Sequence, residues 1–229
     1  MRSTDTILPH LAIRPYQHQD YAALAALIEA SYDFTGADVV PSQYLVNLVA
    51  NLHPSGQLTA WVDNQLVGAM LCRKVPVHRY RAGHTEAMAF DTTRFVEDDR
   101  LGNALYLLDL IVLPAFRKVQ IGSILREQTM QEAFNQGVNF ILGLSRLSGF
   151  HRYQTQFSVE TYVQKVVAGE LTDPILSFHL SYSTPTEVVR IVPNCIPSDT
   201  KSCGYSAILQ VTNPHPKPLA QADGSPVIH

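Results

Sequence analysis

The sequence predicts an α/β domain in which helices flank a mixed central β-sheet, and three patterns support this fold class. Residues 105–113 (LYLLDLIVL) are almost wholly apolar, which is typical of a central strand covered on both faces. A helical pattern and a second apolar strand follow this run, so the three elements form a parallel βαβ unit. Residues 57–75 alternate around a turn and predict an antiparallel hairpin. Parallel and antiparallel pairing together give a mixed sheet.

The composition excludes several classes of protein. Of the 229 residues, 46% are hydrophobic and 16% are charged, which supplies ample material for a core. The formal net charge of −3 and the absence of a basic stripe argue against a nucleic-acid partner. No stretch approaches the roughly 18 apolar residues of a membrane span, and the N-terminus lacks the features of a signal peptide. We therefore expect a cytoplasmic protein that has no membrane partner.

The cysteines predict neither a disulfide framework nor a metal site. Cys72, Cys195 and Cys203 are odd in number and have no paired spacing. Cys195 and Cys203 have no histidine at the spacing of metal ligands. We expect free thiols in a reducing compartment and no bound metal.

The first half of the chain divides into elements by its periodicity. We expect a short leader over 1–10, a strand over 11–15, a helix over 18–32, a second helix from Pro41, the hairpin over 57–75 and a long polar loop over 76–103. The hairpin turn is assigned to Asp63-Asn64-Gln65. A loop as long as 76–103 is either functional or mobile.

The second half follows the same logic. We expect the strand over 105–113, a helix that ends at Gly137, a strand over 138–144, a helix from its cap Ser158 to Gly169, a short helix that starts at Asp173-Pro174, and strands over 187–192 and 205–211. Residues 213–229 are rich in proline and predict an extended tail. The domain therefore covers residues 11–212.

The segment from Arg117 to Gly122 is the most informative for function. It connects the apolar strand, through Pro114, to the start of a helix by a short basic turn that contains glycine. A helix N-terminus presents unpaired backbone N–H groups, which suit a pyrophosphate. Gly122 lets the backbone approach such an anion closely.

This segment resembles the acyl-CoA pyrophosphate loop of the GCN5-related N-acetyltransferase (GNAT) superfamily. The pattern of that loop is Arg or Gln, two residues, Gly, one residue, then Gly or Ala. Arg117 and Gly122 match it, whereas Gln120 stands where the first glycine belongs. A glutamine there either changes the local backbone or partly occupies the phosphate cradle. The order of elements over residues 11–211 agrees with the GNAT fold.

The C-terminal third is similar to the GNAT-like domain that is often fused to carbon–nitrogen hydrolases. Residues 157–178, 191–194 and 203–209 carry this resemblance. It implies a functional link to a carbon–nitrogen hydrolase. Ser183 and the extra residues Pro185-Thr186 depart from the pattern of the fused domain, on the side where an acceptor would enter.

The resemblance implies acetyl-CoA, or another acyl-CoA or acyl-carrier thioester, as the cofactor. The backbone that contacts its pantetheine arm would belong to Leu110, Ile111 and Val112. The residues facing its pyrophosphate would be Arg117, Lys118, Gln120, Ile121, Gly122 and Ser123. Ser123 is equally explained as a helix cap.

Three residues are candidates for acid–base catalysis. By resemblance, His179 occupies the place of a tyrosine that donates a proton to the leaving thiolate, and an imidazole can do so near neutral pH. Tyr182, one turn later, is the alternative donor, and either side chain is also explained by packing. Asp109 interrupts the apolar strand, so it is either a general base acting through water or a structurally paired carboxylate.

Three functions remain open. The first is an acyl-CoA-dependent N-acyltransferase that transfers acetyl to a small-molecule or peptide amine, for which the acidic residues Glu86, Asp91 and 97–99 are suited. The second is a GNAT-like malonyl-thioester decarboxylase and S-acetyltransferase, although Cys195-Ile196-Pro197 replaces the Tyr-Arg-Pro of that group. The third is a non-catalytic CoA-binding or regulatory domain, which Gln120 and Ser183 favour. Edge strands could pair in a homodimer.

Overall fold

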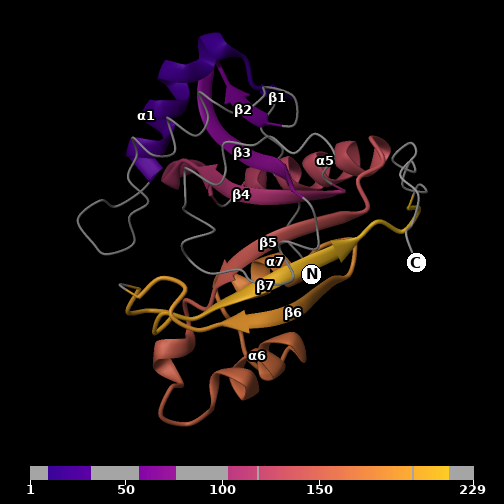
Figure 1. Cartoon of the computed structure of the whole chain (residues 1–229). Coiled ribbons are helices and arrows are strands. Elements are labelled where there is room, and N and C mark those ends of the chain that lie inside the picture. The colour runs from indigo at the N-terminus through magenta and orange to yellow at the C-terminus, as the bar shows by residue number, and fades with distance from the viewer. Residues whose placement is uncertain (1–9, 32–56, 76–102, 118, 198, 217–229) are drawn as a thin grey trace, which may run out of the picture.

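A computed structural model of the chain describes residues 10–31, 57–75, 103–117, 119–197 and 199–216 (Figure 1). The described strands form one seven-stranded sheet in the order β1-β2-β3-β4-β5-β7-β6. The pair β4–β5 is parallel, and the other neighbouring pairs are antiparallel. The predicted mixed sheet with flanking helices is therefore confirmed.

The first three strands form an antiparallel meander. They are β1 (Leu11–Pro15), β2 (Leu58–Val62) and β3 (Gln65–Val75). The turn between β2 and β3 consists of Asp63 and Asn64, whose φ angles are 48° and 65°. Short polar side chains tolerate this left-handed region, and two such residues match the twist of a hairpin. The turn is therefore one residue shorter than predicted, because Gln65 already pairs with Val62.

A buried carboxylate sets the start of the first helix. The chain enters α1 (Tyr21–Ser31) through a short 3-10 turn, η1 (His18–Asp20). Asp20 accepts a hydrogen bond of 2.8 Å from the backbone N–H of Gln17 and forms an ion pair of 2.7 Å with Arg14. The Arg14 guanidinium also lies 4.6 Å from the centroid of the Trp61 ring. These contacts join β1, β2 and the beginning of α1.

The predicted βαβ unit is formed by β4 (Ala104–Val112), α5 (Ile121–Asn135) and β5 (Phe140–Arg146). A short 3-10 helix, η2 (Pro114–Phe116), links β4 to the turn before α5. Gly137 follows α5 with a φ of 86°, as expected for a glycine that ends a helix. The helix begins at Ile121, inside the segment that the sequence assigned to the preceding loop, because Ile121 is fully buried against β3.

The remaining elements are α6 (Val159–Val167), α7 (Leu176–Leu180), β6 (Thr186–Val192) and β7 (Ser206–Thr212). Ser158 caps α6 as predicted, since its Oγ accepts a hydrogen bond from the N–H of Thr161. The short helix near Asp173-Pro174 is also present. It begins two residues after Pro174.

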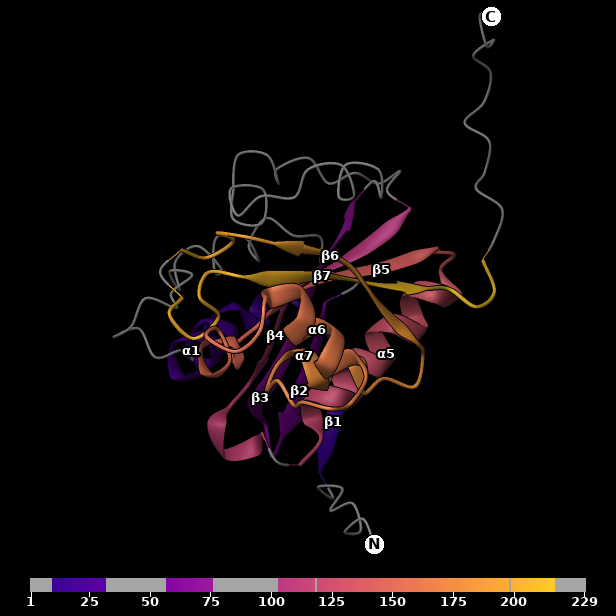
Figure 2. The same ribbon diagram turned by 90° about the horizontal axis from the view of Figure 1, so that it is seen from below.

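Helices α5, α6 and α7 cover one face of the sheet, and α1 covers the other (Figure 2). Leu209 and Val211 are alternate residues of β7 and therefore lie on the same face of the sheet. Leu209 packs with α6 and α7, and Val211 packs with Met130 of α5, so these three helices cover that face. Leu71 and Cys72 are adjacent residues of β3. Leu71 packs with α1 and Cys72 packs with α5, so α1 and α5 lie on opposite faces of the sheet. The core therefore consists of two layers divided by the sheet.

Some sequence predictions lie outside the described residues. They are most of the leader over 1–10, the helix from Pro41, the loop over 76–102 with its acidic residues, and the tail from 217 onwards. None of the three cysteines, all of which lie within the described residues, forms a disulfide; Cys72 and Cys195 are buried, and Cys203 is partly exposed. The described residues contain no helix long and apolar enough to cross a membrane. They also contain no cluster of His, Cys, Asp and Glu side chains that could hold a metal ion.

Candidate functional site

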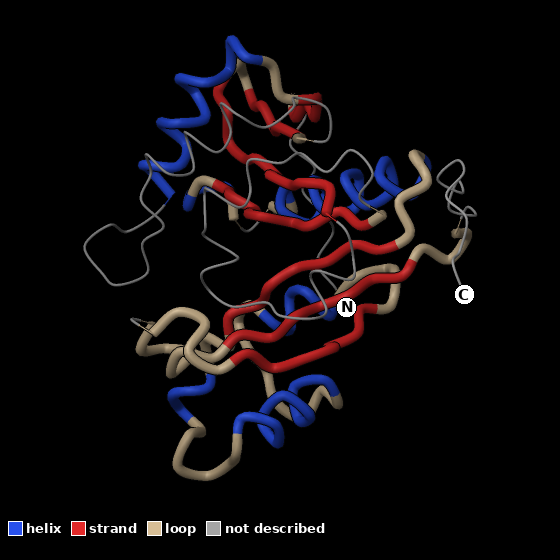
Figure 3. Tube along the Cα trace, in the orientation of Figure 1, coloured by secondary structure: helices blue, strands red, loops and turns tan. Residues whose placement is uncertain are grey.

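The two central strands separate in the middle of the sheet. The parallel register between β4 and β5 ends at Leu107 and Gly143, whereas β4 continues to Val112 and β5 to Arg146. Figure 3 shows the two strands diverging towards their C-terminal ends. A β-bulge causes this divergence, since Leu71 pairs with Asp109 and the next residue, Cys72, pairs with Leu107. The end of β4 therefore presents an edge inside the sheet.

A pocket of about 290 Å³ lies beside this edge. Its walls come from the end of β4, the N-terminus of α5, the C-terminus of α1 and the short helix α7. The lining residues are Ser31, Leu110, Ile111, Val112, Arg117, Gln120, Gly122, Ser123 and Phe178. The structure thus brings together seven of the nine residues that the sequence assigned to a cofactor, and it adds Ser31 and Phe178.

Gln120 retains the backbone of a glycine at the entrance to α5. Its φ of 61° and ψ of 8° lie in the left-handed region, which costs a residue with a side chain about 1–2 kcal/mol. The Gln120 side chain makes no capping hydrogen bond to the N–H groups that follow it. The first hydrogen bond of the helix runs from the backbone N–H of Ile124 to the carbonyl oxygen of Gln120, at 3.0 Å. The turn therefore leaves the first N–H groups of α5 without a cap from Gln120, and the glutamine lines the pocket.

The other residues of the loop divide between the pocket and the core. The Arg117 guanidinium donates to the carbonyl of Val112 at 3.1 Å and to that of Ser31 at 2.9 Å, so it ties the end of β4 to α1. Ile121 is fully buried and leaves only its backbone for a ligand. A Cβ on Gly68 would lie 3.0 Å from the Ile121 side chain, which explains the glycine in β3. The Lys118 side chain lies outside the described residues.

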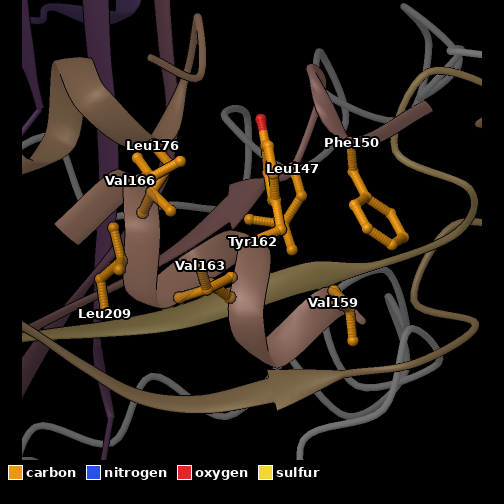
Figure 4. Close-up of a cluster of buried hydrophobic side chains, with 9 residues drawn as sticks. Leu147, Phe150, Val159, Tyr162, Val163, Val166, Leu176 and Leu209 are labelled. Carbon is orange, nitrogen blue, oxygen red and sulfur yellow. The ribbon is translucent and has the colours of Figure 1, made fainter. Parts of the chain in front are cut away.

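A buried carboxylate fixes the start of α7. Asp173 is fully buried and accepts four hydrogen bonds of 2.8–2.9 Å, from the N–H groups of Gly149, Ile175 and Leu176 and from the Tyr162 hydroxyl. Burial raises the pKa of Tyr162, and the Asp173 carboxylate raises it further. Figure 4 shows Tyr162 and Leu176 within the apolar cluster between α6 and the sheet. These contacts place α7 against β5 and the pocket.

Three rings gather at the other end of α7. The rings of Phe178, His179 and Tyr182 contact one another edge to face, with centroids 5.5–6.1 Å apart. His179 Nδ1 also hydrogen-bonds the hydroxyl of Tyr182. Phe178 lines the pocket, whereas His179 and Tyr182 contact the Phe178 ring and are not among the lining residues. The structure therefore brings two of the predicted catalytic residues together, next to a residue of the pocket wall.

The electrostatics of this pair differ from the sequence-based expectation. Burial lowers the pKa of His179 to about 4, and the nearby Arg126 guanidinium lowers it as well. His179 is consequently neutral near neutral pH and does not carry the extra proton of an imidazolium. Burial raises the pKa of Tyr182, and Arg126 acts in the opposite direction. Between the two groups, the hydroxyl of Tyr182 is thus better suited to give a proton to a thiolate.

Asp109 does not join the other two candidates. It is paired in register with Leu71, which packs against α1, whereas Tyr182 packs with Cys72 and Leu105 on the α5 side. Residues paired across antiparallel strands share a face of the sheet. The register therefore places Asp109 on the α1 face, across the diverging strands from His179 and Tyr182.

Besides Ser31 and Phe178, the sequence analysis missed Arg126. Only 2% of its surface is exposed, and its guanidinium carbon lies 2.9 Å from the centroid of the Tyr182 ring and 4.8 Å from that of Phe178. A signal was present, because Arg126 falls on the buried stripe of α5 that includes Ile121, Leu125 and Met130. A charged residue on such a stripe must find specific partners.

Comparisons with known proteins agree with this architecture. Over 205 residues, the chain is 27% identical to the uncharacterized N-acetyltransferase YkwB of Bacillus subtilis (strain 168), covering 89% of each protein. It is 24% identical to the probable hydrolase YhcX of the same organism, of which it spans only 39%. A solved structure of the GNAT-like decarboxylase GphF in complex with isobutyryl-CoA superposes with a TM-score of 0.74 at 25% identity, covering 88% of this chain and 99% of that one.

The match to a protein family is direct. Residues 22–149, more than half of the chain, match the acetyltransferase (GNAT) family. This range contains the diverging strands, the left-handed turn at Gln120 and the whole of α5. The chain therefore belongs to the GNAT acetyltransferase family.

Proposed function

We propose that this protein is an acyl-CoA-dependent N-acyltransferase that transfers acetyl from acetyl-CoA to an amine by direct attack. The observation that carries the proposal is the pocket between the exposed edge of β4 and the uncapped start of α5. Helix N-termini bind the phosphates of nucleotides through their free N–H groups. A free strand edge suits the amide-containing pantetheine arm of CoA, because it offers backbone donors and acceptors.

The residues fit such a ligand. The N–H groups that follow Gln120 would face the diphosphate, and the backbone of Leu110, Ile111 and Val112 would contact the pantetheine arm. Phe178 closes the apolar side of the pocket, where an ideal Cβ on Gly122 would lie 3.7 Å from its ring. A Cβ at position 122 would therefore make ordinary van der Waals contact with this wall. When bound, acetyl-CoA supplies an activated acetyl group at the point where β4 and β5 diverge.

The acid and base of the reaction lie on opposite faces of the sheet. A bond forms between the amine nitrogen and the acetyl carbon, and the bond from that carbon to sulfur breaks. Asp109, on the α1 face, takes the proton of the amine through water. Tyr182, on the α5 face, gives its hydroxyl proton to the departing sulfur, and His179 in its Nδ1-protonated form donates to the resulting phenolate. Positioning supplies much of the acceleration.

Calorimetry with acetyl-CoA tests the binding step. We expect saturable binding by the wild-type protein and an affinity at least about ten-fold lower for Gln120→Glu, because a carboxylate at this turn repels the diphosphate. Gln120→Gly is the matched control, since glycine adopts the same φ without strain, and it should bind at least as tightly as wild type. Equal affinity of the two variants, or no binding by the wild type, contradicts the proposal.

The similarity to GphF favours a second candidate, decarboxylation of a malonyl thioester followed by acetyl transfer to a carrier thiol. The two reactions are separated by incubating the protein with acetyl-CoA and a panel of amines, and in parallel with malonyl-CoA. Release of free CoA that depends on an amine supports N-acyl transfer. Formation of acetyl-CoA from malonyl-CoA supports the second candidate. The similarity to YhcX also makes a hydrolase partner a reasonable proposal for this chain.

A further inference from the structure

Arg126 and its neighbour Glu127 bind the chain on both sides of His179 and Tyr182, the segment that carries the proposed proton donor. Its Nη1 donates to the carbonyl of Phe178 at 3.4 Å, and its Nη2 forms an ion pair of 2.9 Å with Glu127. Glu127 in turn accepts a hydrogen bond of 2.7 Å from the hydroxyl of Ser183. Two adjacent residues of α5 therefore form hydrogen bonds with Phe178, just before His179, and with Ser183, just after Tyr182.

The guanidinium has an unusual environment. It is buried between the rings of Phe178 and Tyr182, and its Nε has no hydrogen-bond partner in the part of the chain that the structure describes. A buried arginine whose only role is structural normally satisfies its N–H groups. Here one N–H stays without a partner among the described residues, although the guanidinium pairs with Glu127, and the positive charge lies against a ring whose hydroxyl bonds His179. A cation beside a phenol stabilises the phenolate relative to the phenol.

We infer that Arg126 is a positioning residue of the acyl transfer: it fixes the Tyr182 hydroxyl on His179 and stabilises the charge that Tyr182 acquires when it gives up its proton. This inference rests on the proposed function. In the transfer step, the proton moves from Tyr182 Oη to the sulfur, and the phenolate remains between His179 Nδ1–H and the guanidinium. Arg126 itself is not among the residues that line the pocket.

The charges around His179 agree with this role. Among the elements that surround α7, Arg126 on α5 lowers the pKa of His179 and Asp173 in the preceding loop raises it, in addition to the effect of burial. A neutral His179 can keep one ring N–H for Tyr182 throughout the physiological range. A protonated His179 beside Arg126 would place two cations on one phenol, which is electrostatically unfavourable.

The experiment combines kinetics with histidine NMR. Arg126→Met keeps an unbranched, flexible side chain but removes the charge, and we expect kcat to fall about ten- to a hundred-fold with little change in KM for acetyl-CoA. Arg126→Lys keeps the charge but not the planar group, so it should recover part of kcat. Arg14→Met is the matched control, because Arg14 also stacks on a ring and pairs with a carboxylate, but on β1.

The NMR readout needs no turnover. Ring-15N histidine labelling, with His179→Gln to assign the signal among the nine histidines, should show that wild-type His179 stays neutral from about pH 8 to about pH 5. In Arg126→Met it should titrate at higher pH, and in Arg14→Met it should not change. An ordinary His179 titration in the wild type overturns the inference, even if the variant does not fold. An unchanged His179 titration in Arg126→Met, or an unchanged kcat in that variant, also overturns the inference.

The two proposals fail in distinguishable ways. If the wild type acetylates no amine, the proposed reaction is wrong, and the NMR comparison still decides whether Arg126 sets the state of His179 and Tyr182. If the wild type is active and Arg14→Met loses as much kcat as Arg126→Met, the loss reflects general stability, and the positioning role is overturned.

Discussion

Two buried charges hold the two ends of α7, and they differ in how they are satisfied. Asp173, before the helix, accepts four hydrogen bonds, and every one comes from the surrounding fold. Arg126, at the other end, lies between aromatic faces and keeps one N–H without a partner among the described residues. The first charge is compensated by hydrogen bonds alone, whereas the second pairs with the Glu127 carboxylate and also lies against two aromatic rings.

This difference separates architecture from chemistry. The partners of Asp173 are the loop after β5, α6 and α7 itself, so the carboxylate joins three elements of the C-terminal half. The partners of Arg126 are its neighbour Glu127, Phe178, which lines the pocket, and Tyr182, which bonds His179. Loss of Asp173 should therefore affect stability most, and changes at the Arg126 end should affect titration and turnover most.

The largest effect is expected for Asp173→Ala. The substitution removes four hydrogen bonds, leaves the buried Tyr162 hydroxyl and the Gly149 N–H without their acceptor, and uncaps α7. We expect it to lower the free energy of unfolding by about 3–5 kcal/mol, measured by urea denaturation. Glu170→Ala is the control, because it removes a carboxylate from an exposed ion pair with Lys165 and should change stability by less than about 1 kcal/mol. Similar values for the two variants would show that the Asp173 network contributes little.

The Arg126 end should dominate the pH dependence. The pKa of His179 is about 4 in the folded protein and about 6.5 when unfolded, so the unfolded chain binds the proton more strongly. The contribution of neutral His179 is therefore complete above about pH 6.5 and is lost as the pH falls towards about 4. Because the ring is partly exposed, we expect a loss of about 2 kcal/mol rather than the full value implied by the shift.

The measurement compares stability curves of wild type and His179→Gln between about pH 4.5 and about pH 7. The carboxylates of Asp20, Glu127 and Asp199 have lowered pKa values and keep their contributions in this window. The difference in stability between the two proteins should narrow as the pH falls. Parallel curves would mean that the pKa of His179 is not depressed, and the contrast between the two ends of α7 would then fail.

The elements of the fold were accessible from the sequence because they depend on local patterns. The apolar run of β4, the alternation of the β2–β3 hairpin and the cap Ser158 each act over a few residues. The pattern of Arg117 and Gly122 was enough to locate the start of α5 to within a few residues. Gln120, which departs from the family pattern, adopts a left-handed conformation at the start of α5.

The missed features depend on contacts between distant segments. The burial of Arg126 follows from the packing of α5 against α7, more than 50 residues later in the chain. The separation of Asp109 from His179 and Tyr182 depends on a one-residue register shift between β3 and β4. Neither the packing partner of a helix nor a bulge is encoded in a local periodicity, so the acid–base arrangement required the structure.

The smallest predicted effect returns to the Asp173 end and tests how tightly it is packed. A Cβ on Gly149 would lie 2.5 Å from the Tyr162 hydroxyl oxygen and 3.2 Å from an oxygen of Asp173, so Gly149→Ala must displace one of them. We expect a loss of about 1–2 kcal/mol in urea denaturation, as for other over-packed interiors. Gly143→Ala in β5 is the control, because nothing lies within 4 Å of its added Cβ, and its stability should stay close to wild type. If Gly149→Ala is equally harmless, the hydrogen bonds of Asp173 can rearrange, and the rigidity that distinguishes this end of α7 from the Arg126 end is absent.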